Sequence, residues 1–325
     1  MRAIIPVAGF GTRLKPHTFS TPKVLLNVGG KPILGHILDQ LIDSKIFNAT
    51  FIVGYLGDKI KEYVERDFPK INATYVEQKE MLGLGHAIYT AIPTFDDDEL
   101  FIILGDTVFD VNLHGVFNTK TTSLGVKEVI DPSRFGVALT DNGRITKLIE
   151  KPKTLVSKLA LVGLYYIANA GLLKDCLVEL VEKDIRTNNE LQLTDALQLM
   201  IDKGEVIKTF PVEGWYDCGK PETLLSTNKF LLDKYGSNKK MKNSLIVDPV
   251  FIGENCTIEN AIIGPYTTIA DNSTIIESII RNSIISENAT VKRAMLDNTL
   301  IGNNAVVKGN FKRLNAGDSS EIEFY

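Results

Sequence analysis

A run near the start of the chain combines glycines and cations as phosphate-binding loops do. It covers residues 7–18 and reads Val-Ala-Gly-Phe-Gly-Thr-Arg-Leu-Lys-Pro-His-Thr. Gly9 and Gly11 allow backbone N–H groups to turn toward an anion, while Arg13 and Lys23 supply full positive charges. The run is neither a dinucleotide fingerprint nor a Walker loop, because the third glycine and the Gly-Lys-Ser/Thr ending are missing. These residue types favour a polyphosphate-binding loop, with a plain tight turn as the alternative.

A second candidate for chemistry is the aspartate of Leu104-Gly105-Asp106. It follows residues 100–104, an apolar run that predicts a buried strand. Open α/β sheets bind their ligands beyond the carboxyl ends of such strands. The position therefore favours a ligand-facing carboxylate, and a role in a turn or a helix cap is the alternative for Asp106 taken alone.

The elements that must position these residues alternate along the first 236 residues. Short β-branched or aromatic runs are followed by stretches whose apolar residues recur at helical spacing, which predicts a mostly parallel α/β sheet. The expected strands cover residues 3–7, 50–53, 74–76, 100–104, 123–129, 136–139 and 161–167. The expected helices cover residues 33–43, 58–67, 86–92, 172–182, 190–203 and 221–235.

Beyond a polar linker at residues 237–243, large aliphatic residues recur every five or six positions. They are Ile252, Ile258, Ile263, Ile269, Ile275, Ile280, Ile285, Val291, Leu296, Ile301 and Val307. Three such units, each with Asn at a tight turn, make one triangular coil with the aliphatic side chains inside. The spacing predicts three to four coils of a parallel β-helix over residues 244–325, and it disfavours an antiparallel domain, whose period would be two.

Composition excludes several classes of protein. The 325 residues include 36 Lys and Arg against 40 Asp and Glu, so no basic field for nucleic acid exists. No run of 18 apolar residues is present, and the three cysteines are widely spaced, which excludes a membrane span and a disulfide framework. We therefore expect a cytoplasmic protein without membrane or nucleic-acid partners.

The loop from Gly9 to Leu14, followed by Pro16, Thr18 and Pro22-Lys23, resembles the signature loop of the sugar-1-phosphate nucleotidyltransferases. These enzymes join a nucleoside triphosphate to a sugar 1-phosphate and release pyrophosphate. Further landmarks of the family follow in its order to about residue 235. The resemblance implies a Rossmann-like, GT-A-like domain, and the hexads resemble the left-handed β-helix that many members carry at the C-terminus.

The resemblance assigns roles to individual residues. Asp106 and Asp217, within Trp-Tyr-Asp-Cys-Gly, correspond to the Mg²⁺ ligands, while Arg13, Lys23 and Asp106 are the expected catalytic residues. The nucleotide-binding positions are Ala8, Gly9, Gly11, Thr12, Arg13, Gln78 and Gly83. The sugar-phosphate positions are Gly136, Glu150, Lys151 and Val162, the last a departure from members with a hydroxyl residue there.

The identity of the substrates is less sharply indicated. Gln78 and Gly83 have the spacing of thymidylyl- and uridylyltransferases, and an amide that both donates and accepts suits the imide of thymine or uracil. This favours dTTP or UTP with glucose 1-phosphate, and the alternative is a mannose-1-phosphate guanylyltransferase.

Two other classes of function are open. A non-catalytic regulatory paralogue should have lost part of the charge set, which is complete here. A β-helix acyltransferase would need a histidine base, and all four histidines precede residue 115. We expect the β-helix instead to assemble a homo-oligomer, because the ends and edges of a solenoid need covering.

Overall fold

The structure is a computed structural model that describes residues 1–95, 99–236, 241 and 243–309. It divides into two compact units, the first formed by residues 1–26 and 31–227, the second by residues 27–30 and those from 228 onward. The predicted linker, residues 237–243, and residues 310–325 of the predicted β-helix lie largely outside the described residues. The domain limits given above therefore stay predictions.

The first unit is built on a nine-stranded sheet with the order β5-β4-β1-β6-β11-β8-β12-β10-β9. The strands are β1 (Arg2–Pro6), β4 (Asn48–Val53), β5 (Asn72–Glu77), β6 (Leu100–Ile103), β8 (Ser123–Glu128), β9 (Gly136–Asp141), β10 (Arg144–Glu150), β11 (Leu159–Ile167) and β12 (Lys208–Pro211). The neighbours β5, β4, β1 and β6 are parallel, as predicted. The other half is mixed, because β11 runs antiparallel to both β6 and β8.

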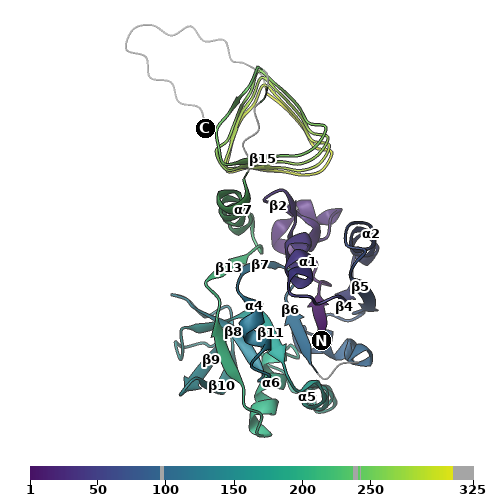
Figure 1. Ribbon diagram of the computed structural model, residues 1–325, viewed down its shortest axis with the longest axis vertical. Helices are drawn as coiled ribbons and strands as arrows, with labels where there is room; N and C mark the ends of the chain where they lie inside the picture. Colours follow the sequence, from purple (N-terminus) through teal and green to yellow (C-terminus); the bar gives the residue numbers. More distant parts are fainter. Residues whose placement is uncertain (96–98, 237–240, 242, 310–325) are drawn as a thin grey trace. The chain divides into compact units, whose positions relative to one another are not determined.

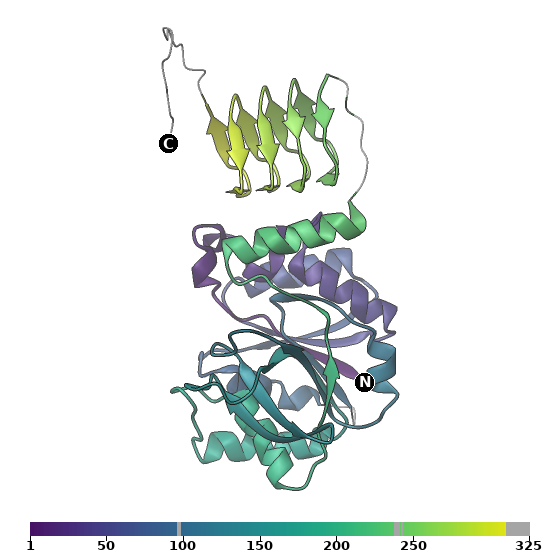
Figure 2. The same cartoon turned by 90° about the vertical axis from the view of Figure 1, so that its left-hand side faces the viewer.

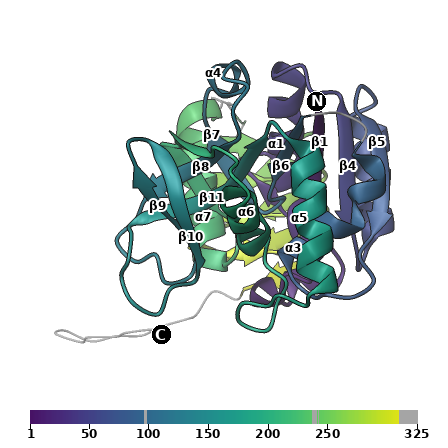
Figure 3. The ribbon, with the colours of Figure 1, turned by 90° about the horizontal axis from the view of Figure 1, so that it is seen from below.

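Helices cover both faces of this sheet (Figure 3). They are α1 (Ile33–Asp43), α2 (Gly57–Asp67), α3 (Leu84–Thr90), α4 (Leu113–Phe117), α5 (Ala170–Glu182) and α6 (Leu193–Asp202). A further helix, α7 (Pro221–Tyr235), begins in the first unit and continues into the second. Along β1, Ala3 and Ile5 join the core beneath α1, α2 and α4, whereas Ile4 joins the core beneath α3, α5 and α6. This alternation with period two lets one strand bury apolar side chains in both layers. Within the part of the chain that the structure describes, no helix is long and apolar enough to cross a membrane.

A small two-stranded ribbon beside the main sheet joins segments that are about a hundred residues apart in sequence. It pairs β7 (Thr107–Asp110) antiparallel with β13 (Gly214–Asp217), and Asp217 lies opposite Thr107. A further hydrogen bond runs from the Cys218 N–H to the Asp106 carbonyl, at 3.1 Å. The ribbon therefore holds the two predicted metal ligands close together.

The second unit contains the repeats as a prism with three sheets, which Figure 1 shows end on and Figure 2 from the side. Over the described residues each sheet has four parallel strands, which makes four coils in residues 243–309, in agreement with the prediction of three to four. The strands are β14 (Leu245–Ile246), β15 (Val250–Ile252), β16 (Thr257–Glu259), β17 (Ile262–Ile263), β18 (Thr267–Ile269), β19 (Thr274–Ile276), β20 (Ile279–Arg281), β21 (Ile284–Ile285), β22 (Thr290–Lys292), β23 (Met295–Asp297), β24 (Leu300–Ile301) and β25 (Val306–Lys308).

The predicted aliphatic residues stack in vertical columns inside the prism. Ile252 pairs with Ile269, which pairs with Ile285, and Ile301 completes that column. Asparagines at the corners adopt positive φ, for example 59° at both Asn272 and Asn304. Asparagine is among the few residues that tolerate this left-handed conformation, which explains the Asn in the repeat.

A buried asparagine ties three segments of the second unit together. The side chain of Asn228, in the second half of α7, accepts hydrogen bonds from the Gly29 N–H at 2.9 Å and the Thr268 hydroxyl at 2.6 Å. Its amide donates to the Tyr266 carbonyl at 3.2 Å. Gly29, beside β2 (Asn27–Val28), has φ of 59°, and a Cβ there would lie 2.5 Å from the Leu231 side chain. Residues 27–30 therefore pack as part of the β-helix unit.

Candidate active site

The signature loop is folded so that only glycine fits at position 11. Gly11 has φ of 61°, and a Cβ there would lie 2.9 Å from Thr18 Cγ2 and 3.0 Å from Lys23 Cβ. The Thr18 hydroxyl donates to the Gly11 carbonyl at 2.9 Å. Thr12 and Arg13 lie exposed in the one-turn 3₁₀ helix Thr12–Leu14, after the buried Ala8 and the exposed Gly9. The loop thus brings Lys23 against its own backbone while leaving that backbone open to a ligand.

Lys23 forms the tightest ion pair of the site. Its Nζ lies 2.6 Å from Asp106 Oδ2, and the Lys23 side chain is only 13% exposed whereas that of Asp106 is 41% exposed. The Thr107 hydroxyl lies 3.4 Å from the other carboxylate oxygen of Asp106. Asp106 therefore keeps one face free for a ligand while a buried cation neutralises the other.

The surroundings of Asp217 act on the pKa of its carboxyl group in both directions, and the net effect is an increase. Burial raises the pKa of its carboxyl group, the neighbouring Asp106 raises it further, and Lys23 lowers it. Two carboxylates that repel one another at an opening are the donor set of a hard divalent cation, which prefers oxygen ligands and would remove the repulsion. Among the residues that the structure describes, no group of three or more His, Cys, Asp or Glu side chains is placed to hold a metal. The pair fits an ion that takes its remaining ligands from substrate phosphates and water.

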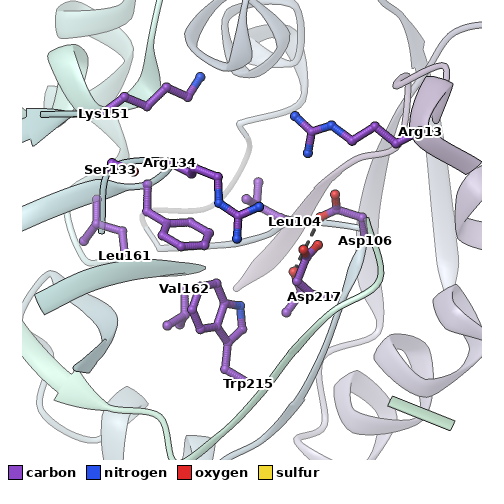
Figure 4. Close-up of a pocket in the computed structure, with 12 residues that line it drawn as sticks. Arg13, Leu104, Asp106, Ser133, Arg134, Lys151, Leu161, Val162, Trp215 and Asp217 are labelled. Atoms are coloured by element: carbon purple, nitrogen blue, oxygen red, sulfur yellow. Dashed lines mark hydrogen bonds between the residues drawn. The ribbon is translucent and has the colours of Figure 1, made fainter. Parts of the chain in front are cut away.

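Both aspartates face a cleft of about 380 Å³ in which charged groups from distant segments meet (Figure 4). Its charged lining consists of three cations and two carboxylates: Arg13, Arg134, Lys151, Asp106 and Asp217. The other lining residues are Leu104, Thr107, Ser133, Phe135, Leu161, Val162 and Trp215. A second hollow of about 240 Å³ is lined by Gly9, Lys23 and Asp106, together with Pro6, Val7, Val24, Leu84, Leu104 and Gly105. Cleft and hollow share Leu104 and Asp106, so the signature loop and the cleft meet at the end of β6.

The predicted base-binding residues form a group of their own. The Gln78 amide is only 5% exposed, and its Nε2 lies 3.4 Å from the Gly83 carbonyl and 3.4 Å from His86 Nδ1. Gly83 has φ of 119°, and a Cβ would lie 2.5 Å from the Leu191 carbonyl oxygen, so this position requires glycine. Gln78 is therefore held against Gly83, although neither residue lines the cleft, and their role in binding the base stays a prediction.

The predicted sugar-phosphate residues also lie close together. Gly136 in β9 pairs with Glu150 in β10, and a Cβ at Gly136 would lie 2.9 Å from Glu150 Oε2. That carboxylate accepts a hydrogen bond from the Thr194 hydroxyl at 2.7 Å, and its Oε1 lies 3.6 Å from Lys151 Nζ. Lys151 and the buried Val162 line the cleft, whereas Gly136 and Glu150 are not among its lining residues.

Sequence analysis missed part of the cleft wall, namely Ser133, Arg134, Phe135 and Trp215. The segment 131–135 has no periodic pattern, and its Asp-Pro-Ser start is typical of an ordinary surface turn. In the structure the Ser133 N–H does donate to Asp131 Oδ1, at 3.0 Å. The place of this segment could not be predicted because its packing partner is distant in the sequence. Phe135 packs on Trp215 of β13, with ring centroids 4.9 Å apart.

An α/β sheet with a glycine-rich loop after its first strand, one aspartate after β6 and a second aspartate on the adjoining ribbon is typical of a nucleotide-binding enzyme. Its glycine-rich loop is neither that of dinucleotide-binding proteins nor that of P-loop proteins. The chain belongs to the nucleotidyl transferase family, which matches residues 2–234. Residues 226–312 match the GlmU-like C-terminal hexapeptide family. These two matches confirm the predicted family, fold and enzyme class, including the left-handed β-helix.

Curated relatives cover the chain to different extents. The bifunctional protein GlmU of Methanocaldococcus jannaschii is 38% identical over 265 residues, which are 81% of this chain but only 61% of that protein. A glucose-1-phosphate thymidylyltransferase of Streptomyces antibioticus is 32% identical over 88% of this chain and 87% of its own length. The UTP–glucose-1-phosphate uridylyltransferase AglF of Haloferax volcanii is 36% identical over 68% of this chain and 93% of its own length.

Each of two similar known structures matches about three quarters of this chain. A putative glucose-1-phosphate thymidylyltransferase from Bacillus anthracis has a TM-score of 0.63 and 27% identity, and the match covers 74% of this chain and 98% of that one. A UDP-glucose pyrophosphorylase complexed with UDP-glucose matches with a TM-score of 0.63 at 24% identity, which supports the fold alone. Enzymes of this family generally use a divalent metal ion, and their substrates are a nucleoside triphosphate and a sugar 1-phosphate.

Proposed function

We propose that this enzyme transfers the nucleotidyl group of UTP or dTTP to glucose 1-phosphate and releases pyrophosphate. The observation that carries the proposal is the cleft in which Arg13, Arg134 and Lys151 face the pair Asp106 and Asp217. Such a set of fixed cations opposite a metal-type carboxylate pair suits the meeting of two phosphorylated substrates. Relatives named for these thymidylyl and uridylyl transfers support the choice of substrates.

The reaction needs no nucleophilic side chain. An oxygen of the sugar phosphate attacks the α-phosphorus, the bond from that phosphorus to the β-phosphate oxygen breaks, and the electron pair leaves with pyrophosphate. Arg13 neutralises the leaving pyrophosphate, Lys23 the reacting phosphates, and Lys151 the incoming sugar phosphate. Catalysis is then positioning and charge stabilisation by groups that are in place before the substrates arrive.

Asp106 and Asp217 would hold Mg²⁺. When bound there, the ion supplies positive charge against the triphosphate, as in other phosphoryl transfers. The role of the protein is to hold the two carboxylates close together through the ribbon of β7 and β13, and to place the Lys23 cation beside Asp106.

Gln78 and Gly83 would select the base. The buried Gln78 amide is held at Gly83 by the contact between its Nε2 and the Gly83 carbonyl. A carboxamide of fixed position can offer one donor and one acceptor, which matches the imide edge of uracil or thymine. Guanine offers a different donor and acceptor pattern, so guanylyl transfer is the outcome that would overturn this choice.

Measuring pyrophosphate release with UTP, dTTP, GTP and ATP, each crossed with a panel of sugar 1-phosphates, tests the proposal. We expect release with UTP or dTTP and glucose 1-phosphate, dependent on a divalent metal. Release only with GTP and mannose 1-phosphate would replace the assignment, and no release with any pair would contradict catalysis.

Lys151→Ala should raise the KM for the sugar 1-phosphate by about 10- to 100-fold, the effect of one lost hydrogen bond to a charged group. The KM for the nucleotide should change little, because Lys151 lies beside Glu150 on the proposed sugar-phosphate side of the cleft. Steady-state kinetics with each substrate varied in turn measures this difference. Lys153→Ala, an exposed lysine two residues on, is the matched control. Equal losses for both substrates would contradict the assignment.

We further propose that the β-helix assembles the enzyme into a homo-oligomer. One sheet of the prism carries an outward ladder of apolar side chains in register, Leu245, Ile262, Ile279 and Met295. They are 59%, 38%, 37% and 80% exposed in the single chain. Contiguous exposed apolar surface of this kind marks an interaction site, and closed homo-oligomers are the common solution.

Ile279→Glu should therefore shift the full-length chain toward the monomer, because it places a charge in the middle of the ladder. Light scattering coupled to size exclusion measures the mass in solution. Thr290→Glu, on another sheet of the prism, is the control and should leave the mass unchanged. A wild type that is already monomeric would contradict the proposal.

A further inference from the structure

The cleft contains one cation to which neither the resemblance nor the roles above give a task. Arg134 lines the cleft, and Figure 4 shows its guanidinium between Lys151 and the two aspartates, directed toward Asp106 and Asp217. Within the described part of the chain it forms no hydrogen bond or ion pair. A guanidinium that forms no direct ion pair in a cleft of charged groups is available to an anionic ligand.

The backbone around Arg134 is held in place on both sides. The Phe135 N–H donates to the Pro132 carbonyl at 3.0 Å and closes the turn. The Lys151 N–H donates to the Phe135 carbonyl, also at 3.0 Å, so the two cationic residues are connected through one hydrogen bond. The loop therefore presents Arg134 and Lys151 to the cleft from a shared support.

The Arg134 side chain also lies close to the aromatic ring of Phe135. The Arg134 guanidinium carbon lies 5.6 Å from the centroid of the Phe135 ring, within cation–π distance. The Phe135 ring in turn packs edge-on against Trp215, with 69° between the planes. The strand of Trp215, β13, also carries Asp217, which lines the same cleft as Arg134. The aromatic pair therefore connects the segment of Arg134 with the strand that carries a proposed metal ligand.

The charges in the cleft require such a group. A sugar phosphate alone carries about −1.5 to −2 charges at pH 7, and the triphosphate adds more. Among the cations assigned above, Lys23 forms an ion pair with Asp106 and Lys151 lies 3.6 Å from Glu150, so both already face a carboxylate. A planar guanidinium can bind a phosphate through two parallel hydrogen bonds, which a lysine cannot do.

We propose that Arg134 binds the phosphate of the sugar 1-phosphate, on the side opposite Lys151, and orients it toward the α-phosphorus. This inference rests on the proposed function and adds a catalytic residue to it. Arg134 would hold the attacking phosphate between the sugar-binding side of the cleft and the carboxylate pair. It would then be engaged in the transition state as well as in substrate binding.

Kinetics of Arg134→Gln, Arg134→Lys and the wild type test this assignment. We expect Arg134→Gln to lower kcat/KM for glucose 1-phosphate by about 10- to 100-fold, with the KM for the nucleotide nearly unchanged. Arg134→Lys should recover part of the loss, since it restores charge without the two-pronged geometry. Arg144→Gln, an exposed arginine at the start of β10 outside the cleft, is the matched control.

A binding measurement separates this role from a merely structural one. Isothermal titration should show weaker binding of UDP-glucose to Arg134→Gln but unchanged binding of UTP, and the melting temperature should stay close to that of the wild type. An active wild type with an equally active Arg134→Gln would overturn the role of Arg134 and leave the proposed function intact. A wild type that releases no pyrophosphate would overturn the function, and equal binding of glucose 1-phosphate by both proteins would then overturn the role of Arg134 as well.

Discussion

Replacing either Asp106 or Asp217 by Asn should lower Mg²⁺-dependent pyrophosphate release by at least about 10²- to 10³-fold, as for the loss of one preorganised electrostatic contact in an active site. Asparagine keeps the volume of aspartate but removes the negative charge that a hard cation requires. The measurement is the rate of pyrophosphate release at saturating substrates over a range of Mg²⁺ concentrations. Near-normal rates in both variants would show that the ribbon of β7 and β13 does not build a metal site.

The melting temperature shows whether a loss of activity in these variants comes from unfolding. Because burial, and then Asp106, raise the pKa of Asp217, the folded chain binds the Asp217 proton more tightly than the unfolded chain does. The resulting cost to the folded state appears as the pH rises through the ordinary aspartate pKa, and it is complete above the raised pKa. At neutral pH without metal, Asp217→Asn should therefore have a melting temperature at or above that of the wild type. Mg²⁺ with nucleotide should stabilise the wild type more than the variant.

Lys23→Ala should lower kcat by about 10²-fold with both substrates saturating, at the lower end of the effects of lost electrostatic groups. Two effects combine, because the variant lacks a cation for the reacting phosphates and leaves Asp106 without its partner at 2.6 Å. The loss should persist at high concentrations of either substrate, which separates it from the KM effect expected for Lys151→Ala.

The matched control for Lys23 is Lys59→Ala. Lys59 also contacts the signature region, through a hydrogen bond from its Nζ to the Ser20 carbonyl at 2.6 Å, but it is exposed and lies outside both hollows. Unchanged activity in Lys59→Ala together with the loss in Lys23→Ala would tie the effect to the ion pair with Asp106. Equal losses would point to a general loosening of the loop.

Sequence reasoning worked where the local pattern also decides the structure. The helix predicted at residues 33–43 is α1 with the same limits, because its apolar spacing faces one core. The β-helix followed from period and turn residues, since each coil repeats the environment of the previous one. The parallel strands β1, β4 and β6 were predictable for a related reason, as continuous apolar runs mark strands buried on both faces.

What could not be predicted depends on pairing between distant segments. The strands β7 and β13 have four residues each and contain aspartate, so neither carries a strand pattern of its own. Arg134 follows a typical turn sequence, and its place in the cleft becomes visible only when Phe135 meets Trp215. Residues 27–30 give no local sign that they belong with the repeats, because their contacts lie about two hundred residues away.

The second unit cannot be exchanged between enzymes as one continuous stretch of sequence. The Asn228 side chain accepts hydrogen bonds from both Gly29 and Thr268. The second unit, which contains the repeats, is therefore formed by two separate stretches of sequence. A chimera that exchanges only the chain after residue 236 would remove Thr268, so the buried Asn228 side chain would lose this hydrogen-bond partner and pack against an unrelated sequence. Grafting the repeats onto another nucleotidyltransferase therefore requires transplanting residues 27–30 and 228–235 with them, and natural recombination of such modules faces the same two-part junction.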